Sequence, residues 1–508
     1  MSSPRTAHAD HATRIALNTA LLYARMVIVM VINLYTVRLV LNALGVIDYG
    51  IFDVVAGLIL VLSSVSNVVA TATQRYFAIA LGERSPTRFQ AIFSVSVVLY
   101  VGFAVLVVLL GETAGLWFVN HGLVIPPEKL RVANLVYQLS IFTFLSGVIH
   151  LPFSSAIITH EHLGTYAAVS IVESVLKLVA AFLIPVFPYE PVLVHGAALL
   201  LVALGTASAF IVIAVTRYPT CRFRMPSDAA PFRELLGFSG WSLFGSVAGV
   251  GLVQVISVLV NMFFGPAIST ARAISLQLSN AVTIFSGSLM TAVKPAMIRS
   301  YSEQSFDFLN RIFNLSNKFI FFGLSVICLP LAFEMDTVLR LWLGTAEAST
   351  VLFSRLIIVY ALIMALNNPI SVVIQATGHV REYHLLVEPF TLLCVPATYL
   401  LFRLGYPAYT TYLAMIAAAL LSHAVRLWCL KRYYPPFDLA AYGTAFVLPS
   451  VVVVALVCGA LAFVHAAVAL VPLRLLLQGL VSCAMTGVLV LLFGVTRDER
   501  AALRAVRR

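Results

Sequence analysis

Apolar runs of about 20 residues, separated by short polar connections, recur along the whole chain and limit what it can fold into. A helix of that length crosses the roughly 30 Å hydrocarbon core of a bilayer, because each residue adds about 1.5 Å along the helix axis. The chain is 61% hydrophobic and only 10% charged, with a mean hydropathy of +0.99. A soluble chain of this length needs far more charged surface. The sequence therefore predicts an all-α polytopic membrane protein.

Fourteen membrane-spanning helices are expected, with only short connections between them. They cover residues 15–41, 51–72, 91–110, 133–156, 164–186, 192–216, 236–260, 267–292, 312–332, 353–375, 384–402, 407–428, 443–465 and 473–495. The first apolar run is too long for a signal-peptide core and lacks a small-x-small cleavage site. We therefore expect it to be an uncleaved first span.

The distribution of lysine and arginine predicts the orientation of these spans. With the N-terminus inside, 21 of the 32 basic residues fall in inside segments or at inner span ends, Arg426 among them, and 4 fall in outside loops. The positive-inside rule then places both termini in the cytoplasm. Because the net charge of +11 is explained by topology, we expect no nucleic-acid partner. The basic tail is expected to contact anionic membrane lipids.

The sequence also repeats itself. "PFSSAIITHEHLGTY" (152–166) and "PISVVIQATGHVREY" (369–383) share five of fifteen positions at an offset of 217, including Pro152/Pro369 and Tyr166/Tyr383. A weaker echo links "LVLNALG" (39–45) with "VLVNMFFG" (258–265). Both pairs fall at equivalent places in two units of six spans. Since six is even, the units should be related by a pseudo-twofold axis along the membrane normal.

This duplication predicts two six-helix lobes followed by two additional helices. The expected order is an N-terminal tail (1–14), a first lobe (15–216), a basic linker (217–235), a second lobe (236–430), two further spans (443–495) and a basic tail (496–508).

Polar faces inside the apolar runs mark the candidate site. Arg25 lies about ten residues into the first span, where a charge costs about 3 kcal/mol and persists only against protein or water. At 100° per residue, Asn18 and Thr36 share its helix face. In the eighth span Arg272 shares a face with Ser275, Ser279, Thr283 and Ser286. The other polar faces hold Gln254, Ser257 and Asn261 in the seventh span, and Asp53, Gly57, Ser64, Asn67 and Thr71 in the second.

Structural alternatives compete with this interpretation. Serine and threonine faces often serve helix packing. Arg25 would be structural if it paired with a buried carboxylate, and Arg272 would be structural if it snorkelled to the outer surface. Arg38 is expected to pair with Asp48 or Asp53 near that surface. Asp53 is also the candidate site for a coupling proton or ion.

Glu173 and Lys177 stand four residues apart and are expected to neutralise each other. The chain lacks GxSxG, a phosphate-binding P-loop, HExxH and any metal-like cysteine spacing. No catalytic residues, metal or cofactor are therefore expected, and the chain should not be an enzyme.

Four segments carry a resemblance to a known family. They are "LNTALLYARMVIVMVINLYTVRLVLNALGVIDYGIFDVVAG" (17–57), "ATATQRYF" (70–77), "FSGWSLFGSVAGVG" (238–251) and "QATGHVREY" (375–383). They resemble the Wzx-type flippases of polysaccharide and O-antigen biosynthesis, a branch of the multidrug/oligosaccharidyl-lipid/polysaccharide (MOP) exporter superfamily. The resemblance covers residues 15–435.

The resemblance implies alternating access in the bacterial inner membrane. The substrate would be a polyprenyl-diphosphate-linked oligosaccharide, a lipopolysaccharide repeat unit moved from the cytoplasmic to the periplasmic leaflet. Polysaccharide polymerase and chain-length proteins would be its partners. In the related lipid II flippase, arginines on the first and eighth helices are associated with the substrate diphosphate, and Arg25 and Arg272 occupy comparable helices. The polar faces would then line the sugar path.

Three other functions remain open. A cation-coupled multidrug exporter of the same superfamily would favour acidic sites, for which Asp53, Glu173 and Glu388 are the deep candidates. A membrane enzyme of polysaccharide assembly would need a substantial outer loop, and the outer loops are short. A scaffold for polysaccharide-assembly proteins is the third.

Overall fold

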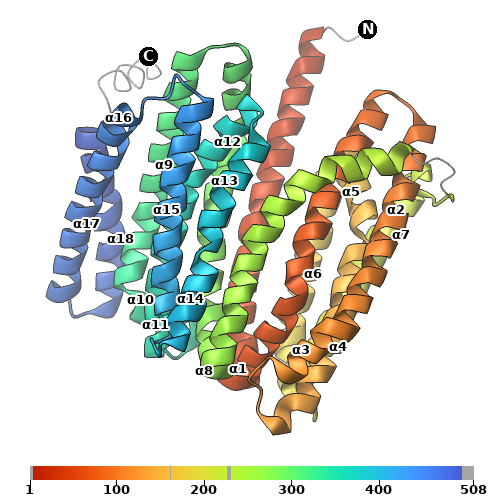
Figure 1. Cartoon of the computed structure of the whole chain (residues 1–508), viewed down its shortest axis with the longest axis horizontal. Helices are drawn as coiled ribbons and strands as arrows, with labels where there is room; N and C mark the ends of the chain where they lie inside the picture. Colours follow the sequence, from red (N-terminus) through yellow and green to blue (C-terminus); the bar gives the residue numbers. More distant parts are fainter. Residues whose placement is uncertain (1–3, 161, 226–229, 495–508) are drawn as a thin grey trace. The chain divides into compact units, whose positions relative to one another are not determined.

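The computed structural model describes residues 4–160, 162–225 and 230–494, and these residues form helices and no strand (Figure 1). The chain divides into two compact units, Met1–Thr270 and Ala271–Arg508. Unit 1 holds α1 (Pro4–Gly82), α2 (Pro86–Leu110), α3 (Leu116–His121), α4 (Leu130–Ile149), α5 (Leu151–Thr159), α6 (Leu163–Leu183), α7 (Pro191–Arg217) and the first part of α8 (Ala230–Ser302).

Unit 2 begins inside α8 and contains the remaining helices. They are α9 (Phe306–Phe333), α10 (Met335–Leu343), α11 (Ala348–Ala365), α12 (Asn367–Thr377), α13 (Val380–Leu392), α14 (Cys394–Arg403), α15 (Thr410–Tyr433), α16 (Leu439–Tyr442), α17 (Leu448–Ala467) and α18 (Val471–Leu489). The unit boundary lies in the middle of α8, whereas the sequence places the start of the second lobe at residue 236. The expected lobe boundaries and their pseudo-twofold axis stay predictions.

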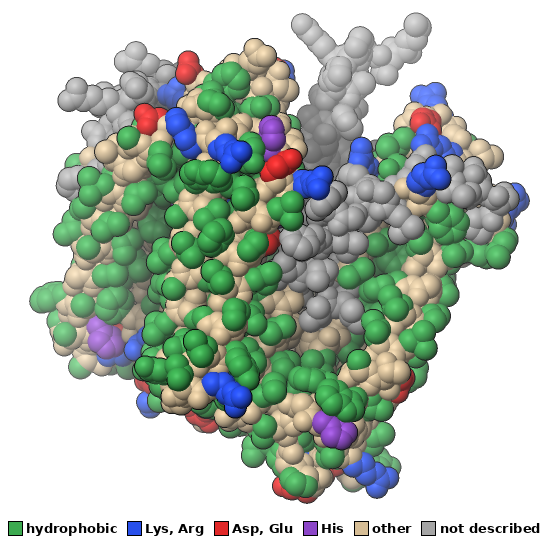
Figure 2. Space-filling model, in the orientation of Figure 1, with side chains coloured by type: hydrophobic (Ala, Val, Ile, Leu, Met, Phe, Trp, Pro, Cys, Tyr) green, Lys and Arg blue, Asp and Glu red, His purple; other side chains and the backbone are tan. Residues whose placement is uncertain are grey.

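Twelve helices of the described residues are long and apolar enough to cross a membrane, so the expected fourteen are not confirmed. Two of the twelve, Arg25–Ile59 in α1 and Gly251–Gly287 in α8, each include a glycine at which the helix bends. Large apolar side chains cover the outer faces of the helices (Figure 2), with Leu201 and Phe463 about 70% exposed. Such a surface fits hydrocarbon as its solvent, and the chain is a multi-pass membrane protein.

The two bends have the same backbone conformation. Gly45 has φ 77° and ψ 172°, and Gly265 has φ 78° and ψ −176°. A positive φ strains any residue with a Cβ, so glycine suits both places. These glycines end the two segments of the weaker sequence echo, which therefore marks one backbone turn used twice.

The bends also pack against each other within unit 1. The Thr270 hydroxyl donates to the carbonyl oxygen of Val46 at 2.5 Å. A Cβ on Gly50 would overlap the carbonyl oxygen of Pro266 and lie 2.7 Å from the Thr270 hydroxyl. Only a residue without a side chain allows this backbone approach.

The stronger repeat marks a second shared feature, a break in the fourth span of each of the two predicted six-span lobes. α4 ends at Ile149 before α5, and α11 ends at Ala365 before α12. The paired prolines Pro152 and Pro369 lie just after these breaks, where a missing N–H and a bulky ring interrupt helical hydrogen bonding.

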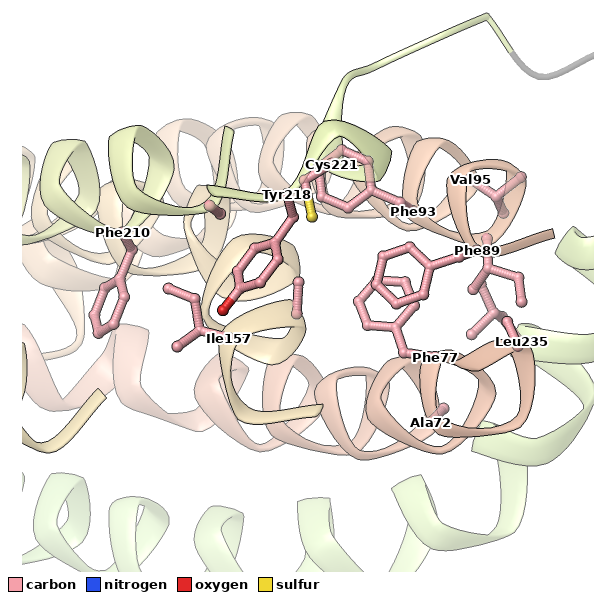
Figure 3. Close-up of a cluster of buried hydrophobic side chains, with 14 residues drawn as sticks. Ala72, Phe77, Phe89, Phe93, Val95, Ile157, Phe210, Tyr218, Cys221 and Leu235 are labelled. Atoms are coloured by element: carbon pink, nitrogen blue, oxygen red, sulfur yellow. The ribbon is translucent and has the colours of Figure 1, made fainter. Parts of the chain in front are cut away.

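An aromatic cluster closes the end of unit 1 that is predicted to be cytoplasmic. The rings of Phe77 and Phe89 stack at 4.4 Å (Figure 3). Tyr218 and Cys221, from the linker after α7, lie buried against the same cluster. Burial raises the pKa of the Cys221 thiol to about 12, so this thiol stays protonated and serves as an apolar side chain.

The C-terminal pair α17 and α18 is held to α9 and α10 by a buried carboxylate. Glu334, whose side chain is 1% exposed, forms an ion pair with Nε of Arg474 at 2.9 Å and lies 2.6 Å from Nδ1 of His465. The Thr337 hydroxyl donates to its second oxygen at 3.1 Å. Burial alone would raise the pKa of Glu334, but these hydrogen bonds and the charge of Arg474 lower it below its ordinary value of 4.5.

The backbone approach at Gly50 predicts intolerance of a methyl group. Gly50→Ala should lower the melting temperature of the purified protein, since forcing an extra carbon into a packed site costs about 1–3 kcal/mol. Gly102→Ala is the matched control, because a Cβ there meets nothing within 4 Å. Equal melting temperatures for the two variants would contradict the close approach.

The Glu334 contacts predict a pH-dependent stability. Glu334→Gln should destabilise the protein at pH 7, where breaking a buried pair costs about 3–5 kcal/mol. Because the folded pKa is lowered, the wild-type advantage is full above the ordinary value of 4.5 and is lost as the pH falls through the lower folded value. Melting temperatures of both proteins, measured stepwise from pH 7 to about pH 3, check this.

The exposed Glu347 provides the control, since Glu347→Gln should leave the curve unchanged. A gap between wild type and Glu334→Gln that persists undiminished at the acid end would show that the charge of Glu334 is not what stabilises the contact.

Candidate functional site

Arg25 lies on α1 with its guanidinium over an aromatic ring. Its central carbon is 4.9 Å from the ring centroid of Tyr166 on α6, and its Nε is buried with no hydrogen-bond partner. The described residues provide no carboxylate partner for it, so the alternative of a structural ion pair finds no support among them. A cation against a ring face is partly stabilised but keeps its positive charge.

Arg272 lies in unit 2 and is fully enclosed. Only 1% of its surface is exposed, so it does not snorkel. Its guanidinium carbon is 5.7 Å from the ring centroid of Tyr412 on α15. The Tyr412 hydroxyl is 2.8 Å from the Ser275 hydroxyl, and Ser275 also donates to the backbone oxygen of Arg272 at 2.7 Å. Arginine, serine and tyrosine thus form one buried network.

The other residues expected to line a sugar path differ in their surroundings. The side chains of Asn18 and Asn67 lie outside the described residues. Thr36 donates to the carbonyl of Ile32 one turn earlier, at 2.8 Å. Its hydroxyl is therefore used within its own helix, as the packing interpretation of such residues expects.

Two expected lining residues of α8 serve local packing in unit 1. Asn261 is 1% exposed, and its side-chain oxygen accepts from the backbone N–H of Val124 at 3.0 Å. Gln254 lies so near α1 that a Cβ on Gly57 would be 2.6 Å from its side-chain oxygen.

In unit 2, Ser279 is half-buried and Thr283 is exposed. The Thr283 hydroxyl donates to the Ser279 carbonyl at 2.9 Å. Of the residues expected on this face, these two leave surface for a passing ligand.

Asp48, one of the two acids expected to pair with Arg38 near the outer edge, has a lysine partner, and the pairing of Arg38 stays a prediction. Lys129 donates to Asp48 at 3.2 Å and to Glu190 at 3.1 Å. Asp53 is half-buried on the second arm of α1. On α6, Lys177 donates to Glu173 at 2.6 Å, which confirms the predicted self-neutralising pair.

The sequence interpretation missed a polar cluster in unit 2 around Arg426. Arg426 was counted among residues at the inner span ends, but it lies within α15 and is only 6% exposed. Its guanidinium donates to the Tyr383 hydroxyl at 2.6 Å, and that hydroxyl is 3.0 Å from the hydroxyl of Ser371. The internal repeat held a signal, because Tyr166 and Tyr383 are paired in it and each has an arginine over its ring.

Close to this cluster lies a buried acid. Glu388 on α13 is 7% exposed and is 3.1 Å from Nδ1 of His384, one turn away. Among the described residues no three His, Cys, Asp or Glu side chains gather as a metal site requires.

No protein-family model and no curated protein sequence matches the chain. Solved structures do. A lipid II flippase, MurJ, in an inward closed conformation matches with a TM-score of 0.71 and 13% identity, covering 94% of this chain and 98% of that one. An inward-facing multidrug resistance MATE family transporter of the MOP superfamily matches with a TM-score of 0.70 and 13% identity, covering 81% and 98%.

A third solved structure is a MOP superfamily transporter from Pyrococcus furiosus, for which a reversed polarity of the binding pocket suggests a different function. It matches with a TM-score of 0.61 and 13% identity, covering 84% of this chain and 95% of that one. These likenesses show the fold. The chain has the all-α, multi-pass fold of MOP superfamily transporters, and these structural neighbours are transporters rather than enzymes.

The network around Arg272 predicts separate roles for the ring and the hydroxyl of Tyr412. Tyr412→Phe keeps the ring and should lower stability by about 1 kcal/mol, the usual contribution of one hydrogen bond. Tyr412→Leu also removes the ring face from a buried guanidinium and should lower stability further. Melting temperatures of the purified variants check this, and equal values for the two would rule out a stabilising role for the ring.

Proposed function

We propose that the chain moves a lipid-linked oligosaccharide, carried on a diphosphate, between the leaflets of the bacterial inner membrane. The observation that carries this proposal is Arg25, a half-buried guanidinium with no carboxylate partner among the described residues. A diphosphate would provide this arginine with a negatively charged partner.

Arginine suits that ligand in particular. Its planar fork of N–H donors matches phosphate oxygens, and charge-assisted hydrogen bonds are roughly twice as strong as neutral ones. Tyr166 contacts the guanidinium through its ring face, and the buried Nε of Arg25 has no hydrogen-bond partner, so donors remain for the substrate. Arg272 is the second proposed contact, and Ser279 and Thr283 are proposed to meet the sugars.

The extent of the structural matches supports a flippase over a drug exporter. The MurJ match covers 94% of the chain and the first MATE match 81%. The difference, 13% of 508 residues, is about 66 residues. That is about the length of two membrane-spanning helices with their connections. For the Pyrococcus furiosus protein, the reversed polarity of the binding pocket suggests a different function, and we use the charge of the site in the same way here.

A cation-coupled multidrug exporter is the second candidate. It is favoured by the MATE matches and by Glu388, a buried carboxylate beside His384. Asp53 is the proposed coupling site in either case. Energy-dependent extrusion of a cationic dye by the reconstituted protein, without movement of lipid diphosphates, would favour this candidate.

Several further features belong to the proposal. Both termini lie in the cytoplasm, and the substrate moves outward by alternating access. Polysaccharide polymerase and chain-length proteins are the partners that such a product requires. No observation favours an assembly enzyme or a scaffold.

The proposal predicts that Arg25 limits transport. In vesicles containing the purified protein and a fluorescent polyprenyl-diphosphate oligosaccharide, Arg25→Ala should slow flipping by about tenfold or more, since a hydrogen bond to a charged group contributes about 1.5–3 kcal/mol. Arg25→Lys should be intermediate, because lysine keeps the charge but not the fork. Flipping is measured as the fraction of label that an added quencher cannot reach.

Arg403 provides the control. It is exposed at the end of α14, and Arg403→Ala should flip as fast as wild type. Flipping by Arg25→Ala at the wild-type rate would remove the role given to Arg25.

A further inference from the structure

We propose that Arg426 is a second phosphate-binding residue, placed to receive the substrate diphosphate near the cytoplasmic end of unit 2. This inference rests on the proposed function and adds a residue that the sequence did not assign to the site. It starts from the charge and surroundings of one side chain.

Arg426 is a buried charge with no ion-pair partner among the described residues. It is 6% exposed, and no described carboxylate lies within ion-pair distance of it. It donates one hydrogen bond, to Tyr383, while its Nε is buried and has no partner. A charge in this position is costly and marks a functional site in membrane proteins.

The buried acid described beside this cluster, Glu388, has a partner of its own. Glu388 bonds with His384, and both stand on α13 with Tyr383. His423, one turn from Arg426 on α15, uses its Nδ1 with the side-chain oxygen of Asn367 at 2.8 Å. The groups around Arg426 therefore have partners of their own, and the guanidinium keeps donors for an added anion.

Another buried arginine of unit 2 shows what a structural role looks like. Arg474 pairs with Glu334 at 2.9 Å and fastens α18 to the turn between α9 and α10. Among the described residues no acid pairs with Arg426 in this way. The difference points to a ligand, and a phosphate group supplies both the charge and the acceptor oxygens.

The two tyrosines paired in the internal repeat are packed differently by the helix that contacts each of them. In unit 1 the ring that packs on Tyr166 from α7 is Phe210, at 5.8 Å between centroids. In unit 2 the side chain that packs on Tyr383 from α15 is Arg426, with its guanidinium carbon 5.4 Å from the ring centroid. On Tyr166 the guanidinium comes from Arg25 of α1 and the contact from α7 is apolar, whereas on Tyr383 the guanidinium comes from α15. We take this extra charge on α15 as a sign that it has a use besides packing.

α15 also connects the new residue with Arg272. Tyr412, which contacts Arg272, and Arg426 are fourteen residues apart, about 21 Å along the axis and within about 40° on the same face. A diphosphate entering from the cytoplasmic leaflet would meet Arg426 first and Arg272 further along.

The test is binding of farnesyl diphosphate, a short lipid diphosphate, to the purified full-length protein in nanodiscs. Arg426→Gln should weaken binding by about tenfold or more, and Arg426→Lys should weaken it less. Farnesol and inorganic pyrophosphate are the comparison ligands. Farnesol, which lacks the diphosphate, should bind far more weakly. Pyrophosphate lacks the lipid chain, so its affinity shows whether the site takes a free anion or needs the lipid.

Two further variants separate binding from structure. Tyr383→Phe removes the hydroxyl that Arg426 bonds but keeps the charge, so it should bind farnesyl diphosphate within about twofold of wild type. Arg432→Gln alters an exposed arginine of the same helix and should bind as wild type. Melting temperatures confirm that each variant is folded.

The outcomes are distinct. If folded Arg426→Gln binds farnesyl diphosphate as tightly as wild type, Arg426 has no role in binding. If Tyr383→Phe weakens binding as much as Arg426→Gln does, the role of Arg426 is also overturned. Both outcomes leave the proposed function standing. Binding of pyrophosphate as tight as that of farnesyl diphosphate overturns the lipid source. No wild-type binding of any phosphate ligand, together with no flipping, overturns the proposed function itself.

Discussion

In hydrocarbon a backbone N–H or C=O finds no water, so nearly every residue of this chain must form its hydrogen bonds within a helix. That constraint leaves few ways to turn. α1 and α8 reverse at single glycines with positive φ, and the hydroxyl of Thr270 donates to a carbonyl next to the first bend. Where the fourth span of each predicted lobe breaks, a proline follows. The positions of the side chains that carry charge depend on these few turning points.

The arginines inside the helices show how the same apolar surroundings handle charge. Arg474 is paired with Glu334, so the pair carries no net charge and holds helices together. Arg25 and Arg426 rest on tyrosine rings, which soften the cost of burial but leave the positive charge in place. The first arrangement suits structure, and the second suits attraction of an anion.

Much of the fold followed from the sequence, because apolar runs and internal identities report local backbone events. The repeat segments coincide with the glycine bends and with the prolines after the broken spans, features that the sequence did not predict by themselves. Glu173 and Lys177 paired as their spacing predicted. Polar faces were less informative. Whether Thr36 or Asn261 lines a path or bonds to backbone depends on neighbours that periodicity does not describe.

Arg426 was missed for a related reason. A hydropathy reading treats the last turns of a span as interfacial, and a basic residue there counts toward topology. Its burial depends on Tyr383, which lies 43 residues earlier and on another helix. Only the arrangement of α13 against α15 distinguishes an anchoring arginine from an enclosed one.

The contrast between Phe210 and Arg426 has a consequence for how such a chain diverges. Two copies of one framework accept either a phenyl ring or a guanidinium on the same tyrosine, with the broken fourth span kept in both. The charge at this place is therefore separable from the architecture. A duplicated framework of this kind can gain or lose an anion contact in one half by a single substitution, while the packing of the other half stays unchanged.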